Sequence, residues 1–322
     1  MTVLPDAVYV LPLRSTAPAD EDLVSYVRAL AGSVDVVVVD GSPPDVFAAH
    51  RAAWGDVAQH LPAPAAPPGA NGKVLAVRAG LAASTASRVV VADDDVRYSL
   101  ATLARALRLL EHADLVRPQN VFSAWPWHAR WDTGRTLLNR AAGADYPGTL
   151  VLRRSALGAD GYAADVLFEN LELMRTVEAR GGRVLSAPGL VVERRPPTLR
   201  AFLGQRVRQA YDSQGQPGRL LLELAAGPAF VLLLLRRRTA WLAAVAVAVA
   251  AVAEAGRRRG GARTSFPATS ALWAPGWAVE RSVCAWWALV SRVRGGARYR
   301  GTRIRTAAHA RSWIARECGV VR

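Results

Sequence analysis

The sequence is poor in cysteine, lysine and, over its last third, acidic residues. Only Cys284 and Cys318 occur in 322 residues, too few for a disulfide framework or a cysteine-based zinc site. Lysine occurs once, at Lys73, so arginine supplies nearly all of the 41 basic residues. Acidic residues number 26 in the whole chain, but only 5 of them lie within residues 201–322.

This shortage of acidic residues divides the chain into two parts. Residues 1–200 carry 21 acidic and 21 basic side chains and are neutral overall, whereas residues 201–322 carry 5 acidic and 20 basic side chains. The net charge of +15 (20 − 5) therefore lies entirely in the second part. Such a distribution indicates a catalytic or binding domain followed by a segment that meets a polyanion, either nucleic acid or anionic lipid.

Two apolar runs in the basic part favour a membrane over nucleic acid. Leu220 to Leu235 contains one charged residue, Glu223, and Thr239 to Ala253 contains none. Each run is shorter than the roughly 20 residues that span a bilayer comfortably, so short spans, a re-entrant hairpin and interfacial helices are all open. Arginine clusters at 236–238 and 257–259 would lie on opposite sides of a membrane crossed twice, against the positive-inside tendency. Two buried helices of a soluble domain are the alternative.

The expected organisation is a catalytic domain over residues 1–215 and a membrane-associated helical region over residues 216–322. Residues 1–15 show no signal peptide, because Pro5 and Asp6 interrupt them and no basic residue precedes the apolar stretch. We therefore expect the first domain to lie at the cytoplasmic face of a membrane. The oligomeric state is not predicted.

Valine-rich runs alternate with helical patterns in the first domain and predict an α/β fold. The predicted strands are Val8–Leu13, Asp35–Asp40 and Arg88–Ala92, and the predicted helices are Asp20–Leu30 and Leu100–Leu110. Continuous apolar runs are typical of strands covered on both faces in a mostly parallel sheet. Ligands bind beyond the carboxyl ends of such strands, where the sequence places Asp40 and three further aspartates.

Those three aspartates, Asp93, Asp94 and Asp95, follow the third predicted strand. Their carboxylates repel one another unless a cation or hydrogen-bond donors neutralise them. Mg²⁺ and Mn²⁺ prefer such oxygen ligands and readily bridge a diphosphate. In an extended stretch Asp93 and Asp95 would face one side and Asp94 the other, which predicts a D-x-D pair that holds metal and diphosphate. A helix cap, the alternative role, needs only one aspartate.

Two more polar residues lie at ends of predicted elements. Asp40 precedes Gly41 and Ser42 and is placed to accept hydrogen bonds from a base or ribose, although Asp-Gly also marks ordinary turns. Lys73 lies near the start of a predicted helix that opens at Asn71. In that position it can meet a phosphate or the aspartate cluster, or remain a solvated surface residue.

In this order the segments resemble the family 2 glycosyltransferases with a GT-A fold, especially their ceramide-glucosyltransferase-like membrane branch. The resemblance covers about residues 5–215 and extends to the apolar tail. The matching motifs are Val36-Val-Val-Val-Asp40-Gly-Ser, Asn71-Gly-Lys73, Val89-Val-Val-Ala-Asp93-Asp-Asp95, Phe168-Glu-Asn-Leu-Glu-Leu173, Gly181-Gly-Arg-Val184 to Val191-Val-Glu193, and Gln205-Arg-Val-Arg208-Gln209.

The resemblance implies roles for the donor-binding positions. Asp40 would contact the nucleotide base, and Asp93 and Asp95 would bind metal and diphosphate, beside Lys73. Gln205 would hold the nucleotide or the acceptor. Arg208 would stabilise the departing diphosphate, because a planar guanidinium suits phosphate oxygens.

The resemblance does not directly supply the catalytic base that removes the acceptor proton, because the family motif is altered in this sequence. The family's base is normally the aspartate of a Glu-Asp-x-Glu motif, and this position is Asn170. Glu169 is the expected substitute, being titratable and adjacent, and Glu172, one helical turn on, is the fallback. Asp165 is a third candidate. The tryptophan that ends the family's last motif is also replaced, by Gln209.

The acceptor side is expected near a tryptophan-rich segment. Trp125, Trp127 and His128 surround Pro126, which argues against a regular buried element and favours an acceptor-binding or membrane-dipping loop. Core packing is the alternative. Gly148 lies where the family shapes the acceptor side of its pocket.

These features together predict an inverting glycosyltransferase that uses Mn²⁺ or Mg²⁺. The expected donor is a nucleotide-diphospho-sugar, a UDP-sugar by resemblance, and the expected acceptor is a lipid or another group at the membrane surface. The alternatives are a processive polysaccharide synthase and a catalytically impaired protein that binds nucleotide-sugar or lipid. A nucleic-acid partner is not expected.

Overall fold

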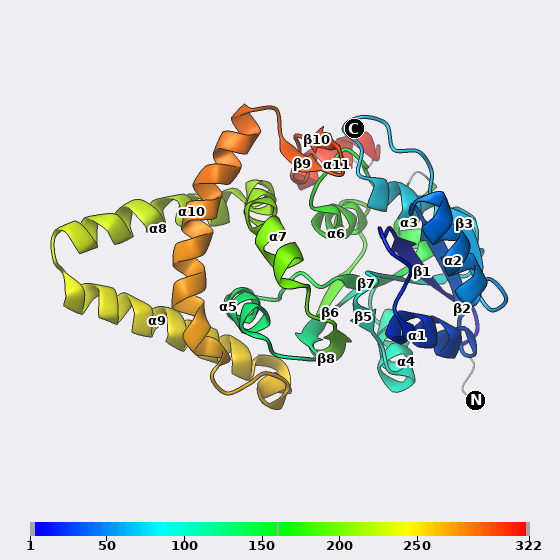
Figure 1. The fold of residues 1–322 in the computed structure, drawn as a ribbon, viewed down its shortest axis with the longest axis horizontal. Helices are drawn as coiled ribbons and strands as arrows, with labels where there is room; N and C mark the ends of the chain where they lie inside the picture. Colours follow the sequence, from blue (N-terminus) through cyan, green and yellow to red (C-terminus); the bar gives the residue numbers. More distant parts are fainter. Residues whose placement is uncertain (1–3, 160, 320–322) are drawn as a thin grey trace.

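The computed structural model describes residues 4–159 and 161–319 as an α/β body with a projecting pair of helices (Figure 1). The strands are β1 (Ala7–Leu13), β2 (Asp35–Asp40), β3 (Gln59–Pro62), β4 (Arg88–Ala92), β5 (Val96–Arg97), β6 (Leu115–Phe122), β7 (Thr149–Arg153), β8 (Val184–Arg194), β9 (Ala297–Tyr299) and β10 (Thr302–Ile304). The helices are α1 (Glu21–Ala31), α2 (Pro44–Trp54), α3 (Gly72–Ala82), α4 (Leu100–Arg108), α5 (Trp127–Ala141), α6 (Glu169–Ala179), α7 (Leu199–Tyr211), α8 (Pro217–Leu235), α9 (Thr239–Arg258), α10 (Ala274–Val293) and α11 (Arg311–Glu317).

Eight of the described strands form one mixed sheet in the order β3-β2-β1-β4-β7-β6-β8-β5. The first four are mutually parallel, and β6 is parallel to β8. By contrast, β7 is antiparallel to both β4 and β6, and β5 is antiparallel to β8. The predicted parallel α/β sheet is thus confirmed for β1 to β4, and the antiparallel strands make the whole sheet mixed.

Helices cover both faces of β1, which explains its continuous apolar sequence. Val8 and Val10 pack with residues of α3 and α6 on one face, whereas Tyr9 and Leu11 pack with α1 and α4 on the other. Gly80 lets α3 lie close to the sheet, since a Cβ there would be 2.5 Å from Cγ1 of Val10. This close packing brings the start of α3 to the carboxyl edge of the sheet.

The tryptophan-rich segment is the start of a helix, not a loop. Pro126 is the residue that precedes the first turn of α5, a position where a missing N–H costs nothing. Trp125 meets Phe122 edge-to-face, and His128 is buried, with its Nε2 donating to the carbonyl oxygen of Pro197 at 2.8 Å. The expectation of an irregular segment here was wrong because proline is excluded only from helix interiors.

Helices α8 and α9 project from the body and meet at a tip, at the left of Figure 1. The tip is Arg236–Arg238, and α8 contributes no residue to the described core. Their length and composition are sufficient to cross a membrane, which by itself is weak evidence. Both helices are longer than the apolar runs, since α8 begins at Pro217 and α9 continues to Arg258.

The chain after α9 returns to the α/β body. Helix α10 packs against α5, α7 and α8, and the β9–β10 hairpin joins the loop before α3, where Gly69 N donates to Thr302 Oγ1 at 2.8 Å. Farther on, His309 N donates to Glu172 Oε2 at 2.8 Å. The segment from α10 to α11 therefore packs on the described residues that precede α8.

Candidate active site

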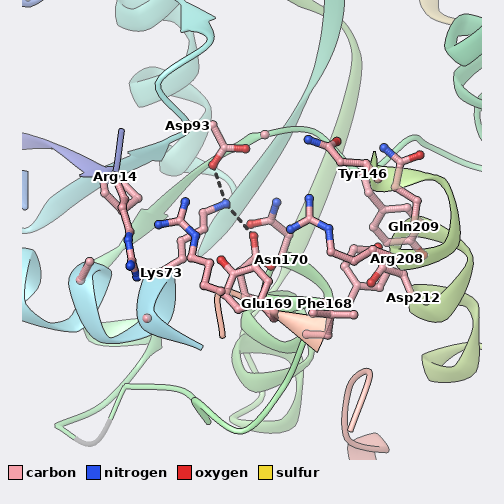
Figure 2. Close-up of a pocket in the computed structure, with 18 of the residues that line it drawn as sticks. Arg14, Lys73, Asp93, Tyr146, Phe168, Glu169, Asn170, Arg208, Gln209 and Asp212 are labelled. Atoms are coloured by element: carbon pink, nitrogen blue, oxygen red, sulfur yellow. Dashed lines mark hydrogen bonds and ion pairs between the residues drawn. The ribbon is translucent and has the colours of Figure 1, made fainter. Parts of the chain in front are cut away.

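A cavity of about 840 Å³ lies beyond the carboxyl ends of β1 and β4 (Figure 2). Its walls come from the start of α3, the turn after β4, the start of α6, one side of α7 and the β9–β10 hairpin. Segments more than 200 residues apart in sequence, such as Lys73 and Thr302, therefore border one space.

Lys73 links two acidic elements of the cavity. Asn71 caps α3 by accepting from Lys73 N at 3.0 Å, and its Nδ2 donates to the carbonyl oxygen of Val166 at 3.0 Å. The Nζ atom of Lys73 lies 2.5 Å from Asp93 Oδ1 and 2.6 Å from Glu169 Oε1. Burial alone would lower the pKa of Lys73, but the two carboxylates raise it above its ordinary value. Lys73 is therefore a permanent cation inside the site.

The three aspartates form a turn at the end of β4 rather than an extended strand. Val96 N donates to the carbonyl oxygen of Asp93 at 3.1 Å, so Asp93, Asp94 and Asp95 all line the cavity. Side-chain alternation holds only in extended backbone, so the geometry on which the predicted D-x-D pair was based does not apply to this turn. Asp94 is exposed at the cavity, where partial desolvation and the neighbouring Asp95 and Asp93 raise its pKa to about 6.

Asp95 combines one satisfied and one unsatisfied carboxylate oxygen. Its Oδ2 accepts from Nε of Arg194, at the end of β8, at 2.7 Å. Its Oδ1 is buried and has no hydrogen-bond partner among the described residues. A buried oxygen of this kind is costly unless a donor or cation meets it. Asp95 therefore retains the capacity to bind one more positive group.

The residues fit a divalent ion bound together with a ligand rather than by protein alone. Within residues 4–159 and 161–319, no cluster of three or more His, Cys, Asp or Glu side chains is placed to hold a metal. Mg²⁺ commonly takes only one or two protein carboxylates and completes its shell with water and substrate phosphates. Asp93 and Asp95, with the free Oδ1 of Asp95, meet that requirement.

Gly148 shapes the wall beside Asp93. Its N–H donates to Asn120 Oδ1 at 2.7 Å, and its carbonyl oxygen accepts from Asp93 N at 2.8 Å. A Cβ at this position would lie 2.7 Å from Asp93 Oδ2. Gly148 thus borders the cavity, in direct contact with the carboxylate of Asp93.

Helices α6 and α7 supply the remaining predicted residues. Glu169 begins α6, and Asn170 Nδ2 donates to the carbonyl oxygen of Pro147 at 2.8 Å, so Asn170 serves to fix the wall. Gln205 and Arg208 line the cavity from α7. The guanidinium of Arg208 lies over the ring of Tyr299, 5.6 Å from its centroid.

Two predicted residues do not reach the cavity. The buried carboxylate of Asp40 accepts from Ser42 N at 2.8 Å, His50 Nδ1 at 2.7 Å and His60 Nε2 at 3.1 Å, which leaves it closed to a nucleotide base. Glu172 is fully buried and accepts from both N and Nδ1 of His309. Because both carboxylates are engaged in the interior, the predicted roles of Asp40 and Glu172 are corrected to structural ones.

The predicted acceptor residues of the tryptophan segment are also outside the cavity. Trp125 packs against the cluster under α9, Trp127 is 49% exposed and meets Phe202 edge-to-face, and His128 is tied to the loop before α7. These side chains hold α5 and α7 together. Gly148 alone of the predicted acceptor residues borders the cavity.

Sequence reasoning missed Asp212, which borders the cavity beside Arg208 (Figure 2). Burial raises the pKa of Asp212 to about 7 against the opposing effect of Arg208, with Glu169 adding to the rise. The signal was present, because Asp212 follows Arg208 by four residues and so shares its helix face. Arg281 and the hairpin residue Tyr299 were also missed, and no local pattern marks either of them.

Comparison with known proteins supports the fold. No protein-family model matches the chain, and no curated protein sequence matches it. Among solved structures, the mannosyltransferase PcManGT from Pyrobaculum calidifontis, in complex with GDP-Man and Mn²⁺, aligns with a TM-score of 0.54 at 19% identity, over 88% of this chain and 87% of that one. The fold is of the GT-A type.

Two further glycosyltransferases align less well. Glucosyl-3-phosphoglycerate synthase from Mycobacterium tuberculosis has a TM-score of 0.43 at 19% identity, over 61% of this chain and 74% of its own. Mannosyl-3-phosphoglycerate synthase from Rubrobacter xylanophilus has a TM-score of 0.40 at 16% identity, over 62% and 69%. The likeness to PcManGT therefore carries the assignment of the GT-A fold, which agrees with the fold predicted from the motifs.

Proposed function

We propose that the chain is a metal-dependent, inverting glycosyltransferase that takes a sugar from a nucleotide-diphospho-sugar. The observation that carries the proposal is the placement of Asp93, Asp95, Lys73 and Arg194 around one end of a cavity in the GT-A fold. The similar mannosyltransferase was solved with a nucleotide-sugar and Mn²⁺, which supports the same donor class here.

The donor diphosphate is assigned to the end of the cavity that carries these charges. Asp93 and Asp95 would hold Mn²⁺ or Mg²⁺, which supplies charge neutralisation of the leaving diphosphate. Lys73 and Arg208 provide fixed cations, and Gln205 provides an amide toward the nucleotide or the acceptor. Because these groups are already in place, they stabilise the departing charge without reorganising. A UDP-sugar is the first donor to test, and GDP-sugars are the second.

Two carboxylates are available to remove a proton from the acceptor. Glu169, predicted from the sequence, is held by Lys73, whereas Asp212 has no ion pair within the described residues. We assign the role of catalytic base to Asp212. Glu169 then serves to position Lys73. A base near neutrality combines the ionised form with useful basicity, and the raised pKa of Asp212 meets that condition.

Helices α8 and α9 are proposed to attach the enzyme to a membrane, on the cytoplasmic face. Their exposed side chains include Leu221, Leu222, Val231, Leu232, Leu234, Leu235, Trp241, Val245, Val247 and Val252. The 19 residues of α8 extend about 28 Å at roughly 1.5 Å per residue, close to the hydrocarbon thickness of about 30 Å. A lipid or other membrane-surface acceptor follows from this attachment.

The function is tested by nucleoside diphosphate release. Detergent-solubilised protein is incubated with UDP-, GDP- and dTDP-sugars and Mn²⁺, with and without added membrane lipid. At least one donor is expected to turn over, and Asp95→Ala is expected to abolish its metal-dependent turnover. Asp56→Ala, which removes an exposed carboxylate paired with Arg28, is the matched control. Full activity of Asp95→Ala would refute the metal site, and no turnover of any donor would favour an impaired binding protein.

Membrane attachment is tested separately by fractionation. The wild-type chain is expected in the membrane fraction, and the pair Leu232→Glu and Leu234→Glu on exposed positions of α8 is expected to release it. Each charge costs about 2.5–3.5 kcal/mol in a bilayer centre. Leu100→Glu, at an exposed position of α4, is the control and should not alter fractionation. A soluble wild-type chain would contradict the attachment.

A further inference from the structure

Arg281 is a buried cation that lies over the ring of Trp277, 4.9 Å from its centroid, and has no carboxylate partner within the described residues. It lies in the middle of α10, is 2% exposed and lines the cavity. Its Nε and Nη1 atoms are buried without a hydrogen-bond partner, and no ion pair within 4 Å is formed with any residue of 4–159 or 161–319. Burial lowers the pKa of Arg281 to about 10, opposed by Glu223, so the side chain stays charged at neutral pH. The stacking on Trp277 and the nearby Glu223 compensate this charge in part, and an anion bound in the cavity would stabilise it further.

The surroundings of Arg281 are more basic than acidic. Arg135 is balanced by Asp132 and Asp145, each at 3.4 Å. Arg219 donates through Nε to Glu223 at 2.8 Å and through Nη1 to Asn139 at 2.9 Å, and its Nη2 forms no hydrogen bond with the part of the chain that the structure describes. The cavity carboxylate at this end is Asp212, which the buried surroundings keep partly protonated near neutral pH.

This basic end is distinct from the donor end. Lys73 comes from α3 and Asp93 from the turn after β4, whereas Arg281 and Arg219 come from α10 and α8. Figure 1 shows α3 and β1 at the opposite side of α7 from α10. The diphosphate therefore has its own cations, and Arg281 is available to a second anion.

The basic end of the cavity lies next to the start of the apolar helix α8. Arg219 lies in the first turn of α8, where unpaired backbone N–H groups and the helix dipole favour an anion. The exposed apolar residues Leu221 and Leu222 follow at once. An anionic group at Arg281 would thus lie where the cavity meets the proposed membrane-facing surface.

We propose that Arg281, assisted by Arg219, binds a phosphate monoester carried by the sugar acceptor. A guanidinium binds phosphate oxygens through adjacent N–H donors, and Nη2 is the nitrogen of Arg281 that the described residues do not enclose, so it is the donor that an anion in the cavity can reach. The inference rests on the proposed transferase function, of which it specifies the acceptor class. Binding of the phosphate positions the acceptor in the cavity. The transfer of the sugar depends on the residues named under the proposed function.

The test measures binding of defined phosphates to the full chain in non-ionic detergent. Dodecyl phosphate, dodecanol and glycerol 3-phosphate are titrated while tryptophan fluorescence and heat are recorded. Dodecyl phosphate is expected to saturate one site and to bind at least tenfold more tightly than dodecanol. Arg281→Gln is expected to weaken it tenfold or more, Arg281→Lys to retain part of the affinity, and Arg219→Gln to weaken it about threefold. Arg105→Gln, at an exposed position of α4, should have no effect.

The outcomes distinguish a lipid phosphate from a soluble phosphate. They also distinguish a failure of this inference from a failure of the proposed transferase function. Glycerol 3-phosphate binding as tightly as dodecyl phosphate would support a soluble phosphorylated acceptor, and a preference for dodecyl phosphate would support a lipid phosphate. Equal affinity of wild type and Arg281→Gln overturns the inference. Thermal unfolding verifies that Arg281→Gln is folded, and Arg281→Lys keeps the test valid if it is not. Donor turnover without Arg281-dependent phosphate binding defeats this inference alone, whereas phosphate binding without turnover of any donor defeats the proposed function.

Discussion

Lys73 Nζ lies 2.6 Å from Oε1 of Glu169 and thereby joins the start of α6 to the aspartate turn. The same nitrogen lies 2.5 Å from Asp93 Oδ1, so one cation serves two carboxylates. Lys73 stays protonated because both carboxylates raise its pKa. The relationship assigns Glu169 to organising the donor end of the cavity.

Lys73→Met keeps the length of the side chain and removes its charge. Asp93 and Glu169 would then face each other without compensation, and the donor diphosphate would lose a cation. We expect kcat/KM for the donor to fall about 100-fold, which corresponds to about 2.7 kcal/mol. Lys73→Arg should recover part of the loss. Initial rates of nucleoside diphosphate release at varied Mn²⁺ measure this effect, and an unchanged kcat/KM would contradict a role of Lys73 in the donor site.

Gly148→Ala should disturb Asp93 directly. The new Cβ would lie 2.7 Å from Asp93 Oδ2, inside van der Waals contact, so the carboxylate must move away from its position at the donor end. Overpacking of this kind typically costs about 1–3 kcal/mol in stability, and we expect donor turnover to fall more than tenfold. Gly218→Ala is the control, since a Cβ there meets nothing within 4 Å. Equal activity of the two variants would show that Asp93 is not confined.

Asp212 should determine the pH dependence of transfer. Arg208, Arg281 and Arg135 face it and stabilise its ionised form, whereas burial and Glu169 disfavour that form and raise its pKa to about 7. If Asp212 is the base, kcat/KM should fall about tenfold per pH unit below pH 7 and level off above it.

Asp212→Asn is expected to remove this dependence together with most of the activity. Glu169→Gln is the comparison, and its larger effect should be on the donor KM. A pH profile that is unchanged in Asp212→Asn would transfer the role of base back to Glu169.

His309 should make stability depend on pH. Burial would lower its pKa, but Asp165 and Glu172 raise it to about 9 from an ordinary 6.5. A raised pKa means that the folded state binds the proton more tightly, so this stabilisation is complete below about pH 6.5 and is lost as pH rises through about 9. The pKa difference corresponds to about 3 kcal/mol before solvent screening, and because Asp165 is 62% exposed we expect the free energy of unfolding to fall by about 2 kcal/mol across that window.

His309→Gln should remove that part of the pH dependence. Denaturant titrations at several pH values measure it, and His112→Gln, at an exposed position, is the control. A wild-type stability that is flat between pH 6 and 10 would exclude the contribution of His309.

Local patterns predicted the elements that end at the donor site. The buried valine runs ending at Asp40 and Ala92 are β2 and β4, and Asn71 does cap the helix that carries Lys73. These features depend on neighbouring residues only: strand runs are read from continuous hydrophobicity, and a cap from the residue before the first turn. The extended backbone expected for Asp93–Asp95 is instead a turn, which the hydrogen bond from Val96 N to the carbonyl oxygen of Asp93 closes.

Two predictions that rested on position in a motif were wrong, because both carboxylates are buried and hydrogen-bonded in the interior. Asp40 is enclosed by His50 and His60, which no motif pairs with it. Glu172 is enclosed by His309, 137 residues farther along the chain. A carboxylate at a motif position can therefore be structural when hydrogen-bond donors from remote parts of the sequence bind it. Only the tertiary structure shows whether such donors are present.

The sequence by itself determined that aspartates follow a buried strand, that a lone lysine opens a helix, and that a basic apolar segment follows a neutral domain. These are consequences of local hydrophobic periodicity, capping and charge, which act over a few residues. Only the tertiary structure decided that Lys73 bridges Asp93 and Glu169, that Asp212 borders the cavity, and that Arg281 is buried without an ion pair to any described residue. Such relations arise from packing among α3, α6, α7 and α10, whose mutual placement depends on contacts remote in sequence.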